Sequence, residues 1–263
     1  MSLMESLRRI ASAAALLAPL ALALAAGCAP GVVGRTAEGA EIVQLPLRLS
    51  NAYLIKTKTP ILIDAGTYGD MQDLERQLLE HGVRLRDLRL VVVTHAHADH
   101  AGLASDLRER TGAALVHGAG DVAQAERGRN DDLKPTSFMA TLLKPTIPQN
   151  FPEFMPDREI TSTAPLDLAP WGIRGSVVQM PGHTQGSVVV VLENKVAFVG
   201  DEMLGGNLGG MLFAHTPGEH YYQADAAENR RNVGALLGQG IETFYLGHGG
   251  PVKREDVVRE LGF

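Results

Sequence analysis

The sequence predicts an α/β protein, a four-layer αββα sandwich that folds as a single domain. Short apolar runs typical of strands alternate with stretches whose apolar residues recur at helical spacing. This alternation occurs before and after a proline-rich segment at residues 128–157. The order of elements suggests two similar halves joined into one αββα unit.

The first half begins with strands and continues as alternating helices and strands. Strands are expected at residues 41–45, 51–56, 60–64, 90–93 and 113–117, and helices at residues 70–81, 99–110 and 120–127. In the first helix Met71, Leu74 and Leu78 fall on one face, and Gly82 ends it. Residues 90–93 are Leu-Val-Val-Val, which is typical of a buried strand.

Residues 128–157 interrupt this pattern. Five prolines exclude long regular elements here, namely Pro135, Pro145, Pro148, Pro152 and Pro156. Phenylalanine, leucine and methionine residues lie among them. The segment is either a lid or binding loop, or a surface loop packed on the core.

The second half again contains strands and helices. Strands are expected at residues 173–180, 187–192, 195–199 and 243–246, and helices at residues 224–237 and 254–260. No short sequence repeat relates the two halves.

Composition restricts the class of protein. Of 263 residues, 45% are hydrophobic and 21% are charged, as in ordinary globular proteins. The formal net charge is −6, and no long basic run occurs. Because binding to phosphate backbones needs a basic face, we expect no nucleic-acid partner.

The N-terminus is typical of an export signal. Arg8 and Arg9 precede the uncharged, Ala/Leu-rich residues 10–26. Small residues directly before Cys28, the only cysteine, resemble a bacterial lipoprotein processing site. We therefore expect a signal peptide at residues 1–27, a lipidated tether at 28–40 and the folded domain at 41–263. An uncleaved anchor, or cleavage without lipidation, is the alternative.

This interpretation predicts where the protein is found. It would be exported and held to a bacterial membrane by a lipid on Cys28, facing the periplasm or the cell exterior. A lone cysteine also excludes a disulfide within the chain.

A cluster of potential metal ligands follows the strand at residues 90–93. His95, His97, Asp99 and His100 fall within six residues. Imidazole and carboxylate are the usual zinc ligands where thiolate is absent. Residues two apart in an extended stretch point to the same side, so His95 and His97 can bind one ion. Asp99 and His100 can then face a second ion.

Three further residues follow expected strands in glycine-containing turns. These are His183 in Pro-Gly-His-Thr, Asp201 in Val-Gly-Asp and His248 in Leu-Gly-His-Gly-Gly. A rigid scaffold can direct a side chain outward from such a strand end. The repetition of this arrangement favours one composite metal site.

These segments resemble the metallo-β-lactamase superfamily of hydrolases, from about Ile42 to the C-terminus. The motif His-x-His-x-Asp-His at residues 95–100 is highly specific for that family. The resemblance implies two zinc ions per chain. One would be bound by His95, His97 and His183, the other by Asp99, His100 and His248, with Asp201 as the bridge. Asp64 matches the first family motif and would support the site.

The implied reaction is hydrolysis of a small-molecule substrate. Two zinc ions would share a hydroxide that attacks a carbonyl carbon, while Asp99 and Asp201 orient it and relay its proton. The bond would be an ester, lactone, thioester or amide. By similarity to lactonases of the family, Tyr221 or Tyr222 would donate a hydrogen bond to the oxyanion.

Subgroups of the family provide the alternatives. β-Lactamase activity is disfavoured, because one lactamase subgroup uses a cysteine ligand and another lacks the bridging aspartate. Glyoxalase-type thioesterases share the ligands but have a helical region after the last one, whereas 15 residues follow His248 here. A mononuclear iron persulfide dioxygenase, an oxidoreductase, is similar around residues 95–100. A non-catalytic binding lipoprotein is disfavoured, because no ligand is missing.

The other histidines are expected to lie outside the chemistry. His81 falls at a helix end, and His117 follows a strand and is expected to be half-buried. His215 and His220 lie near the expected site, either touching substrate or, as the favoured interpretation, in a surface loop.

Overall fold

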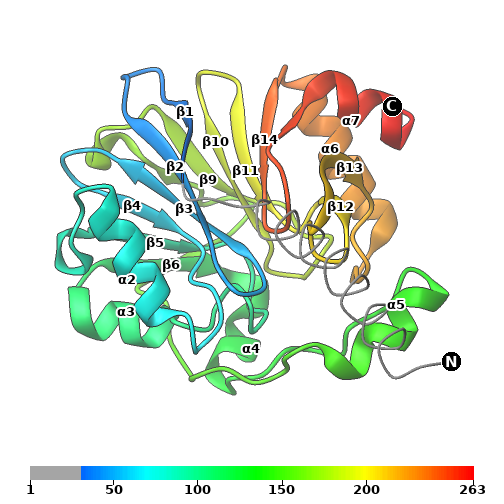
Figure 1. Ribbon diagram of the computed structural model, residues 1–263, viewed down its shortest axis with the longest axis horizontal. Coiled ribbons are helices and arrows are strands. Elements are labelled where there is room, and N and C mark those ends of the chain that lie inside the picture. Colours follow the sequence, from blue (N-terminus) through cyan, green and yellow to red (C-terminus); the bar gives the residue numbers. More distant parts are fainter. Residues whose placement is uncertain (1–30) are drawn as a thin grey trace, which may run out of the picture.

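The computed structural model describes residues 31–263, and two sheets form its centre (Figure 1). The first sheet has seven strands in sequence order. They are β1 (Gly31–Arg35), β2 (Glu41–Pro46), β3 (Asn51–Lys56), β4 (Ile61–Ile63), β5 (Leu90–Val93), β6 (Ala114–Gly118) and β7 (Arg158–Ile160). Neighbouring strands are antiparallel from β1 to β4 and parallel from β4 to β7.

The second sheet has six strands in the order β15-β14-β11-β10-β9-β8. They are β8 (Leu166–Asp167), β9 (Gly175–Gln179), β10 (Val188–Leu192), β11 (Val196–Gly200), β14 (Thr243–Leu246) and β15 (Val252–Lys253). The pair β11 and β14 is parallel, whereas the other pairs are antiparallel. A separate hairpin is formed by β12 (Leu204–Asn207) and β13 (Leu212–Gly218).

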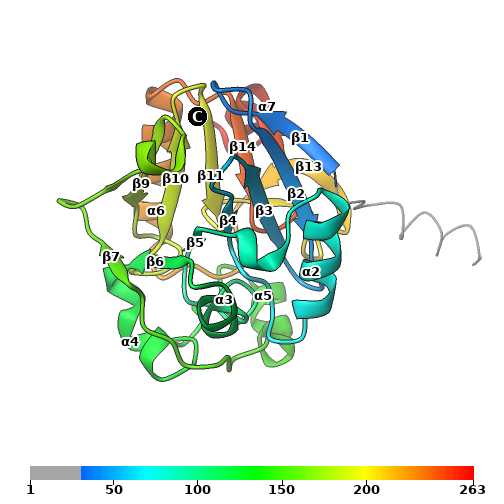
Figure 2. The same ribbon diagram turned by 90° about the vertical axis from the view of Figure 1, so that its left-hand side faces the viewer.

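Helices cover the outer faces of the two sheets (Figures 1 and 2). The α-helices are α2 (Met71–Glu80), α3 (Ala104–Thr111), α4 (Val122–Glu126), α5 (Phe138–Leu143), α6 (Ala226–Gly238) and α7 (Arg254–Leu261). Short 3-10 helices lie at η1 (Leu85–Asp87), η2 (Ala119–Asp121), η3 (Lys144–Thr146) and η4 (Ala169–Trp171). Leucines of α2 and α3 pack on the first sheet, and α6 and α7 pack on the second.

Side chains that point alternately to the two faces of each sheet form the three cores between these four layers. In β2, Val43 faces the helices of the first half, whereas Ile42 faces the second sheet. In β10, Val190 faces the first sheet and Val189 faces α6. Successive side chains of a strand point to opposite faces, so continuous apolar strands supply both cores. The predicted αββα sandwich is confirmed.

The segment predicted as a tether differs in part from that prediction. Residues 31–35 form β1, which pairs with β2 at the edge of the first sheet. Its two glycines and the register shift between Val32 and Gly34 weaken the alternating pattern that identifies a strand in the sequence. The predicted signal peptide and Cys28 lie outside the described residues. Within residues 31–263, no helix is long and apolar enough to cross a membrane.

The helix predicted at residues 99–110 begins later, at Ala104. Asp99 to Leu103 instead forms a turn that pairs with the segment after β4. Ala65 donates to the His100 carbonyl and Gly102 to the Gly66 carbonyl. These hydrogen bonds take the place of the first helical turn, and they leave both Asp99 and His100 free to face the site.

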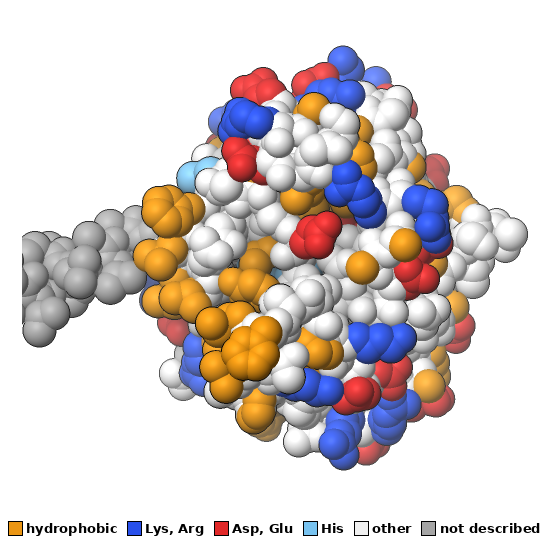
Figure 3. All heavy atoms as spheres, turned by 90° about the vertical axis from the view of Figure 1, so that its right-hand side faces the viewer, with side chains coloured by type: hydrophobic (Ala, Val, Ile, Leu, Met, Phe, Trp, Pro, Cys, Tyr) orange, Lys and Arg blue, Asp and Glu red, His pale blue; other side chains and the backbone are white. Residues whose placement is uncertain are grey.

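Residues 128–157 contain only short helices, as the prolines predicted. The six-residue α5 begins at Ser137, whose hydroxyl accepts a hydrogen bond from Ala140 N. The β12–β13 hairpin was not predicted, because five glycines and exposed side chains hide its strand pattern. Hydrophobic side chains gather on the face that Figure 3 shows. Phe138 of α5 and Phe213 of the hairpin are 84% and 76% exposed.

Candidate metal centre

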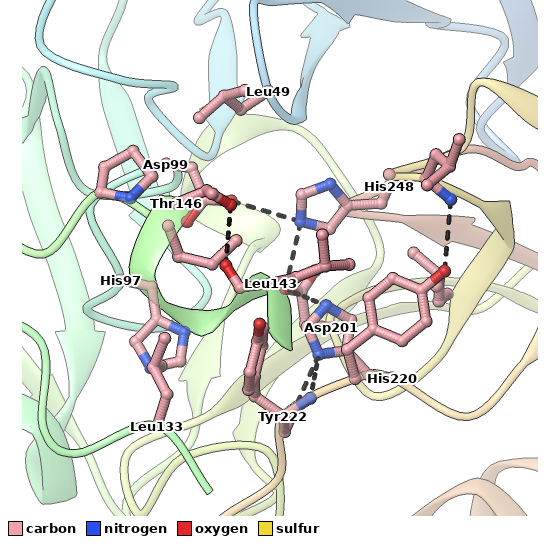
Figure 4. Close-up of a pocket in the computed structure, with 16 residues that line it drawn as sticks. Leu49, His97, Asp99, Leu133, Leu143, Thr146, Asp201, His220, Tyr222 and His248 are labelled. Carbon is pink, nitrogen blue, oxygen red and sulfur yellow. Dashed lines mark hydrogen bonds and ion pairs between the residues drawn. The ribbon is translucent and has the colours of Figure 1, made fainter. Parts of the chain in front are cut away.

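The predicted ligands meet at one end of the two sheets. The turn at residues 94–103 follows β5, Asp201 directly follows β11, and His248 lies two residues after β14. His183 lies in the connection between β9 and β10. Because β5, β11 and β14 end at the same edge of the sandwich, the seven side chains converge from both halves of the fold. Figure 4 shows His97, Asp99, Asp201 and His248 around one cavity.

The first group consists of three buried histidines. Nδ1 of His97 lies 3.0 Å from Nε2 of His183. The ring of His95 lies edge-on to both, at centroid distances of 4.7 Å and 4.4 Å. One nitrogen from each ring lies within 4.8 Å of the others. Tetrahedral donors about 2.1 Å from a zinc ion stand about 3.4 Å apart, so this group fits one ion.

The second group consists of Asp99, His100 and His248. Nε2 of His248 is 3.3 Å from Oδ2 of Asp99 and 3.5 Å from Nε2 of His100. Nε2 of His100 is 3.8 Å from the same carboxylate oxygen. These separations again bracket the spacing of ligands around a single ion.

Asp201 lies between the two groups. Its Oδ2 is 3.8 Å from Nε2 of His95 and 3.7 Å from Nε2 of His183. The same oxygen is 3.3 Å from Nε2 of His248, and Oδ1 is 3.4 Å from Nε2 of His100. One carboxylate therefore reaches donors of both groups, as a bridging ligand must.

Asp64 orients one histidine of each group. Its Oδ2 accepts a hydrogen bond from Nδ1 of His100 at 3.0 Å and another from the Thr94 hydroxyl at 2.9 Å. That hydroxyl is 3.1 Å from Nδ1 of His95 and can accept its proton. In their neutral forms both rings therefore carry the lone pair on Nε2, toward the site. Asp64 adopts a left-handed φ of 63°, which aims its carboxylate beneath the end of β5.

His183 is oriented by a backbone group. Its Nδ1 lies 2.8 Å from the carbonyl oxygen of Tyr222, to which it donates. Its Nε2 therefore carries the lone pair that faces His97. Such hydrogen bonds from the second ring nitrogen are the usual support of metal-binding histidines.

Burial and charge determine the protonation of the centre. Burial holds the pKa of His95 and of His183 well below the usual range, so both rings keep their lone pairs. Burial also acts on His248, but the Asp201 and Asp99 carboxylates outweigh it and raise its pKa to about 10. A cation in the second group would displace this proton, because bound metal competes with protons for the same atoms.

The unsatisfied atoms of the site match a metal centre. Nε2 of His95 and Oδ1 of Asp201 are buried and have no hydrogen-bond partner. Buried polar atoms without partners are costly unless an ion or water satisfies them. A Cβ at Gly247 would overlap the Asp201 carboxylate and stand 2.6 Å from the His100 ring. The residues present therefore fit the bound metal that a His/Asp donor set predicts.

Asp121 ties together the two loops that carry the first group. Its carboxylate accepts hydrogen bonds from Ala96 N at 3.0 Å, the Thr184 hydroxyl at 2.6 Å and Gly186 N at 2.8 Å. It is fully buried. Nothing in the sequence indicates this role, because Asp121 follows an ordinary strand and lies outside the motifs.

The two candidate tyrosines differ. The Tyr222 hydroxyl donates to the Ala140 carbonyl at 2.9 Å, so it is already engaged. The Tyr221 hydroxyl accepts from Leu208 N at 3.2 Å and keeps a proton to donate. Both line the same cavity. Of the two, Tyr221 alone has a hydroxyl proton free to meet a substrate oxyanion.

Three of the four remaining histidines lie outside the centre. His81 caps the end of α2, and the exposed His215 is hydrogen bonded to the Pro251 carbonyl at 2.9 Å. His117 is fully buried rather than half-buried, with Nδ1 3.2 Å from the Val93 carbonyl.

His220 belongs to the centre, so the favoured interpretation as a surface-loop residue is wrong. It is 6% exposed, and its Nε2 lies 3.1 Å from Oδ2 of Asp201 (Figure 4). Its Nδ1 is 3.2 Å from Tyr222 N, which donates to it. When Nδ1 accepts this hydrogen bond, Nε2 carries the ring proton and can donate it to Asp201; the same Nδ1 also lies 3.1 Å from the Tyr222 carbonyl oxygen. The hairpin that positions His220 has no clear sequence pattern, which explains the miss.

Comparisons with known proteins agree with this geometry. The model of the metallo-beta-lactamase superfamily matches residues 45–248, and the chain belongs to that superfamily. A "Probable metallo-hydrolase" of Methanocaldococcus jannaschii is 28% identical over 205 residues, covering 76% of this chain and 87% of that protein. A "Probable metallo-hydrolase" of Bacillus subtilis is 26% identical, covering 80% and 70%.

A third relative carries a more specific name. The hydroxyacylglutathione hydrolase of Haemophilus influenzae is 27% identical, covering 64% of this chain and 74% of that protein. Among solved structures, the Rm3 metallo-beta-lactamase has a TM-score of 0.62 at 16% identity, covering 86% of this chain and 80% of that chain. The structural likeness shows the fold, and the family and its named relatives make the chain a metal-dependent hydrolase.

Proposed function

We propose that the protein is a dizinc hydrolase that cleaves an ester, lactone, thioester or amide bond. The observation that carries the proposal is the position of Asp201, within 3.3–3.8 Å of ring nitrogens in both ligand groups. His95, His97 and His183 would hold one ion. Asp99, His100 and His248 would hold the other.

When bound, two zinc ions would supply a hydroxide nucleophile at neutral pH and polarise the carbonyl under attack. The chain's own groups then handle orientation and protons. Oδ2 of Asp99, beside the cavity, accepts the proton of the attacking water. Nε2 of His220 holds Oδ2 of Asp201 in place. The Tyr221 hydroxyl donates its proton as a hydrogen bond to the developing oxyanion.

The choice of bond stays open within this class. The name of the Haemophilus influenzae relative favours including thioesters among the substrates tested. β-Lactam hydrolysis is disfavoured, because the resemblance stated above associates dedicated β-lactamases with a cysteine ligand or with the absence of the bridging aspartate. Asp201 is present, and Cys28 is the only cysteine.

A screen of the zinc-loaded protein against a lactone, an ester, a thioester and a β-lactam tests the proposal. We expect hydrolysis in at least one of the first three reactions. The His95→Ala/His97→Ala double variant should lose that activity together with bound zinc. Full activity in the double variant would sink the assignment. Iron near one per chain, with oxygen uptake on a persulfide, would instead establish the dioxygenase alternative.

Export and lipid anchoring are part of the same proposal. They are supported by the sequence alone: Arg8 and Arg9, the apolar residues 10–26, and the small residues before Cys28. Fractionation of cells that express the full chain should recover the protein with membranes. A Cys28→Ser variant should leave the membrane fraction, and its retention there would contradict lipidation at this residue.

A further inference from the structure

The cavity over the metal centre has mostly apolar walls. Its volume is about 240 Å³, and the metal-binding side chains form its base. The walls include Leu49, Leu133, Leu143, Ile147, Leu204 and Leu208. They come from α5 and the segments on either side of it, from the β12–β13 hairpin, and from the turn between β2 and β3, which carries Leu49. Figure 4 shows Leu133, Leu143 and Tyr222 around the same cavity as His97.

No lysine or arginine lines this cavity in the part of the chain that the structure describes. The nearest candidates along the chain are Arg48, Lys134 and Lys144, and each has a partner elsewhere. Nε of Arg48 lies 3.8 Å from Oδ1 of Asp70. Nζ of Lys144 pairs with Asp132 at 2.6 Å. Nζ of Lys134 donates to the Ala224 carbonyl at 3.0 Å, and Lys134 lines a separate cavity of about 40 Å³. A carboxylate on a substrate would therefore find no cationic side chain along the walls.

The tyrosines make the walls less polar than their hydroxyls suggest. Tyr222 presents its ring, since its hydroxyl is bonded to the Ala140 carbonyl. The Tyr221 hydroxyl is fixed at the hairpin turn by Leu208 N. Thr146 is the remaining side-chain hydroxyl among the lining residues. Polar groups are therefore concentrated at the base of the cavity, where the scissile bond must lie. The part of the substrate beyond that bond contacts apolar side chains.

We infer that the natural substrate is an uncharged carbonyl compound with an apolar acyl chain, which packs between α5 and the β12–β13 hairpin. The inference rests on the proposed hydrolase activity and specifies its substrate class. In the reaction, water adds its oxygen to the acyl carbon, the bond to the leaving oxygen or sulfur breaks, and that atom takes up a proton. The products are a carboxylate, a released proton and an alcohol or thiol.

A series of 4-nitrophenyl esters of straight-chain acids tests the inference. Burial of each added methylene should raise kcat/KM by about fourfold until the chain outgrows the cavity. The 4-nitrophenyl monoester of adipic acid matches the hexanoate in length but ends in a carboxylate. It should be hydrolysed more than about tenfold less efficiently than the hexanoate, because its charge would be buried without a partner.

Variants of the cavity walls test whether the walls cause the dependence of kcat/KM on chain length. Leu143→Ser and Leu208→Ser should flatten the dependence on chain length. Leu142→Ser is the matched control, because Leu142 neighbours Leu143 on α5 but is 62% exposed and does not line the cavity. Leu143→Lys should raise kcat/KM for the adipate ester relative to the hexanoate. The inference would be overturned if kcat/KM depended on chain length equally in all variants. It would also be overturned if the unmodified protein hydrolysed the adipate ester more efficiently than the hexanoate ester.

A binding measurement distinguishes failure of this inference from failure of the proposed function. Saturation-transfer NMR on metal-free protein should detect 1-hexanol, and the signal should fall in the Leu143→Ser variant but not in Leu142→Ser. Metal-dependent hydrolysis without any chain-length effect, together with no hexanol signal, would reject the inference and leave the hydrolase proposal intact. Hexanol binding with no hydrolysis of any ester, lactone or thioester would support the apolar site and reject the hydrolase proposal.

Discussion

Replacing Asp64 by asparagine should weaken metal binding, most directly in the group that contains His100. In the native protein Oδ2 of Asp64 accepts the Nδ1 proton of His100 at 3.0 Å. An asparagine nitrogen at that position donates instead, so Nδ1 of His100 must accept and its proton must move to Nε2. That atom faces Asp201 Oδ1 at 3.4 Å and is the one that would bind metal. A protonated Nε2 has no lone pair for a cation.

The expected magnitude follows from this change of tautomer. Loss of a hydrogen bond that orients a metal-binding histidine typically costs about 10- to 100-fold in metal affinity, or roughly 1.4–2.7 kcal/mol. The Asp64→Asn variant should keep its bond from Thr94 N, which the remaining oxygen can accept as Oδ1 does at 2.7 Å. Folding should therefore survive, with the Kd for the second zinc ion raised by that factor.

Calorimetric titration of zinc into metal-free protein measures this directly. Asp70→Asn is the matched control, because Asp70 is also buried and its Oδ2 also accepts from a threonine N–H and hydroxyl, both at 2.7 Å, away from the predicted ligands. It should leave both zinc affinities unchanged. A folded Asp64→Asn variant with two unchanged Kd values would refute the tautomer argument.

The remaining predictions concern His220 and Asp157. His220→Phe keeps a ring but removes the Nε2 donor to Asp201, so kcat should fall by about 10- to 100-fold; His220→Gln, which keeps a donor, should lose less at a similar melting temperature. An equal loss of kcat in the two variants would show that His220 contributes only packing. Burial raises the pKa of Asp157, but hydrogen bonds from Arg108 and Leu115 N outweigh it and lower the pKa. A lowered folded pKa stabilises the protein above the unfolded pKa, about 3.9, and this contribution disappears as pH falls through the folded value. In urea unfolding of the metal-free protein, Asp157→Asn should therefore lower the free energy of unfolding by up to about 1 kcal/mol at pH 7 and by progressively less below pH 4. A loss of unfolding free energy that is the same at pH 7 and below pH 4 would contradict the pairing of Asp157 with Arg108.

Much of the sandwich could be predicted because its strands are buried on both faces. Runs such as residues 90–93 and 188–192 are continuously apolar, and α2 has a clear helical stripe. Strand ends also led to the seven predicted ligands, and the structure brings these side chains together. The sequence could not reveal β1 or the β12–β13 hairpin. Their glycines and exposed side chains provide no periodic apolar pattern.

The site residues whose roles could not be predicted from the sequence depend on three-dimensional contacts. His220 lies on the connection after β13, and only the hairpin's placement brings its Nε2 to Asp201. Asp121 resembles any polar residue after a strand until its carboxylate is seen to bind the loops of both halves. The distinction between Tyr221 and Tyr222 depends on which hydroxyl is already bonded. None of these contacts has a fixed spacing along the chain.

The claim that the two ligand groups hold two catalytic zinc ions is tested most directly by one titration. Metal-free protein is titrated with zinc while bound metal and hydrolysis of 4-nitrophenyl hexanoate are followed together. We predict no hydrolysis without zinc, two ions bound per chain, and full activity only as the second site fills. Undiminished hydrolysis by the metal-free protein, or binding of no zinc at all, would contradict the account.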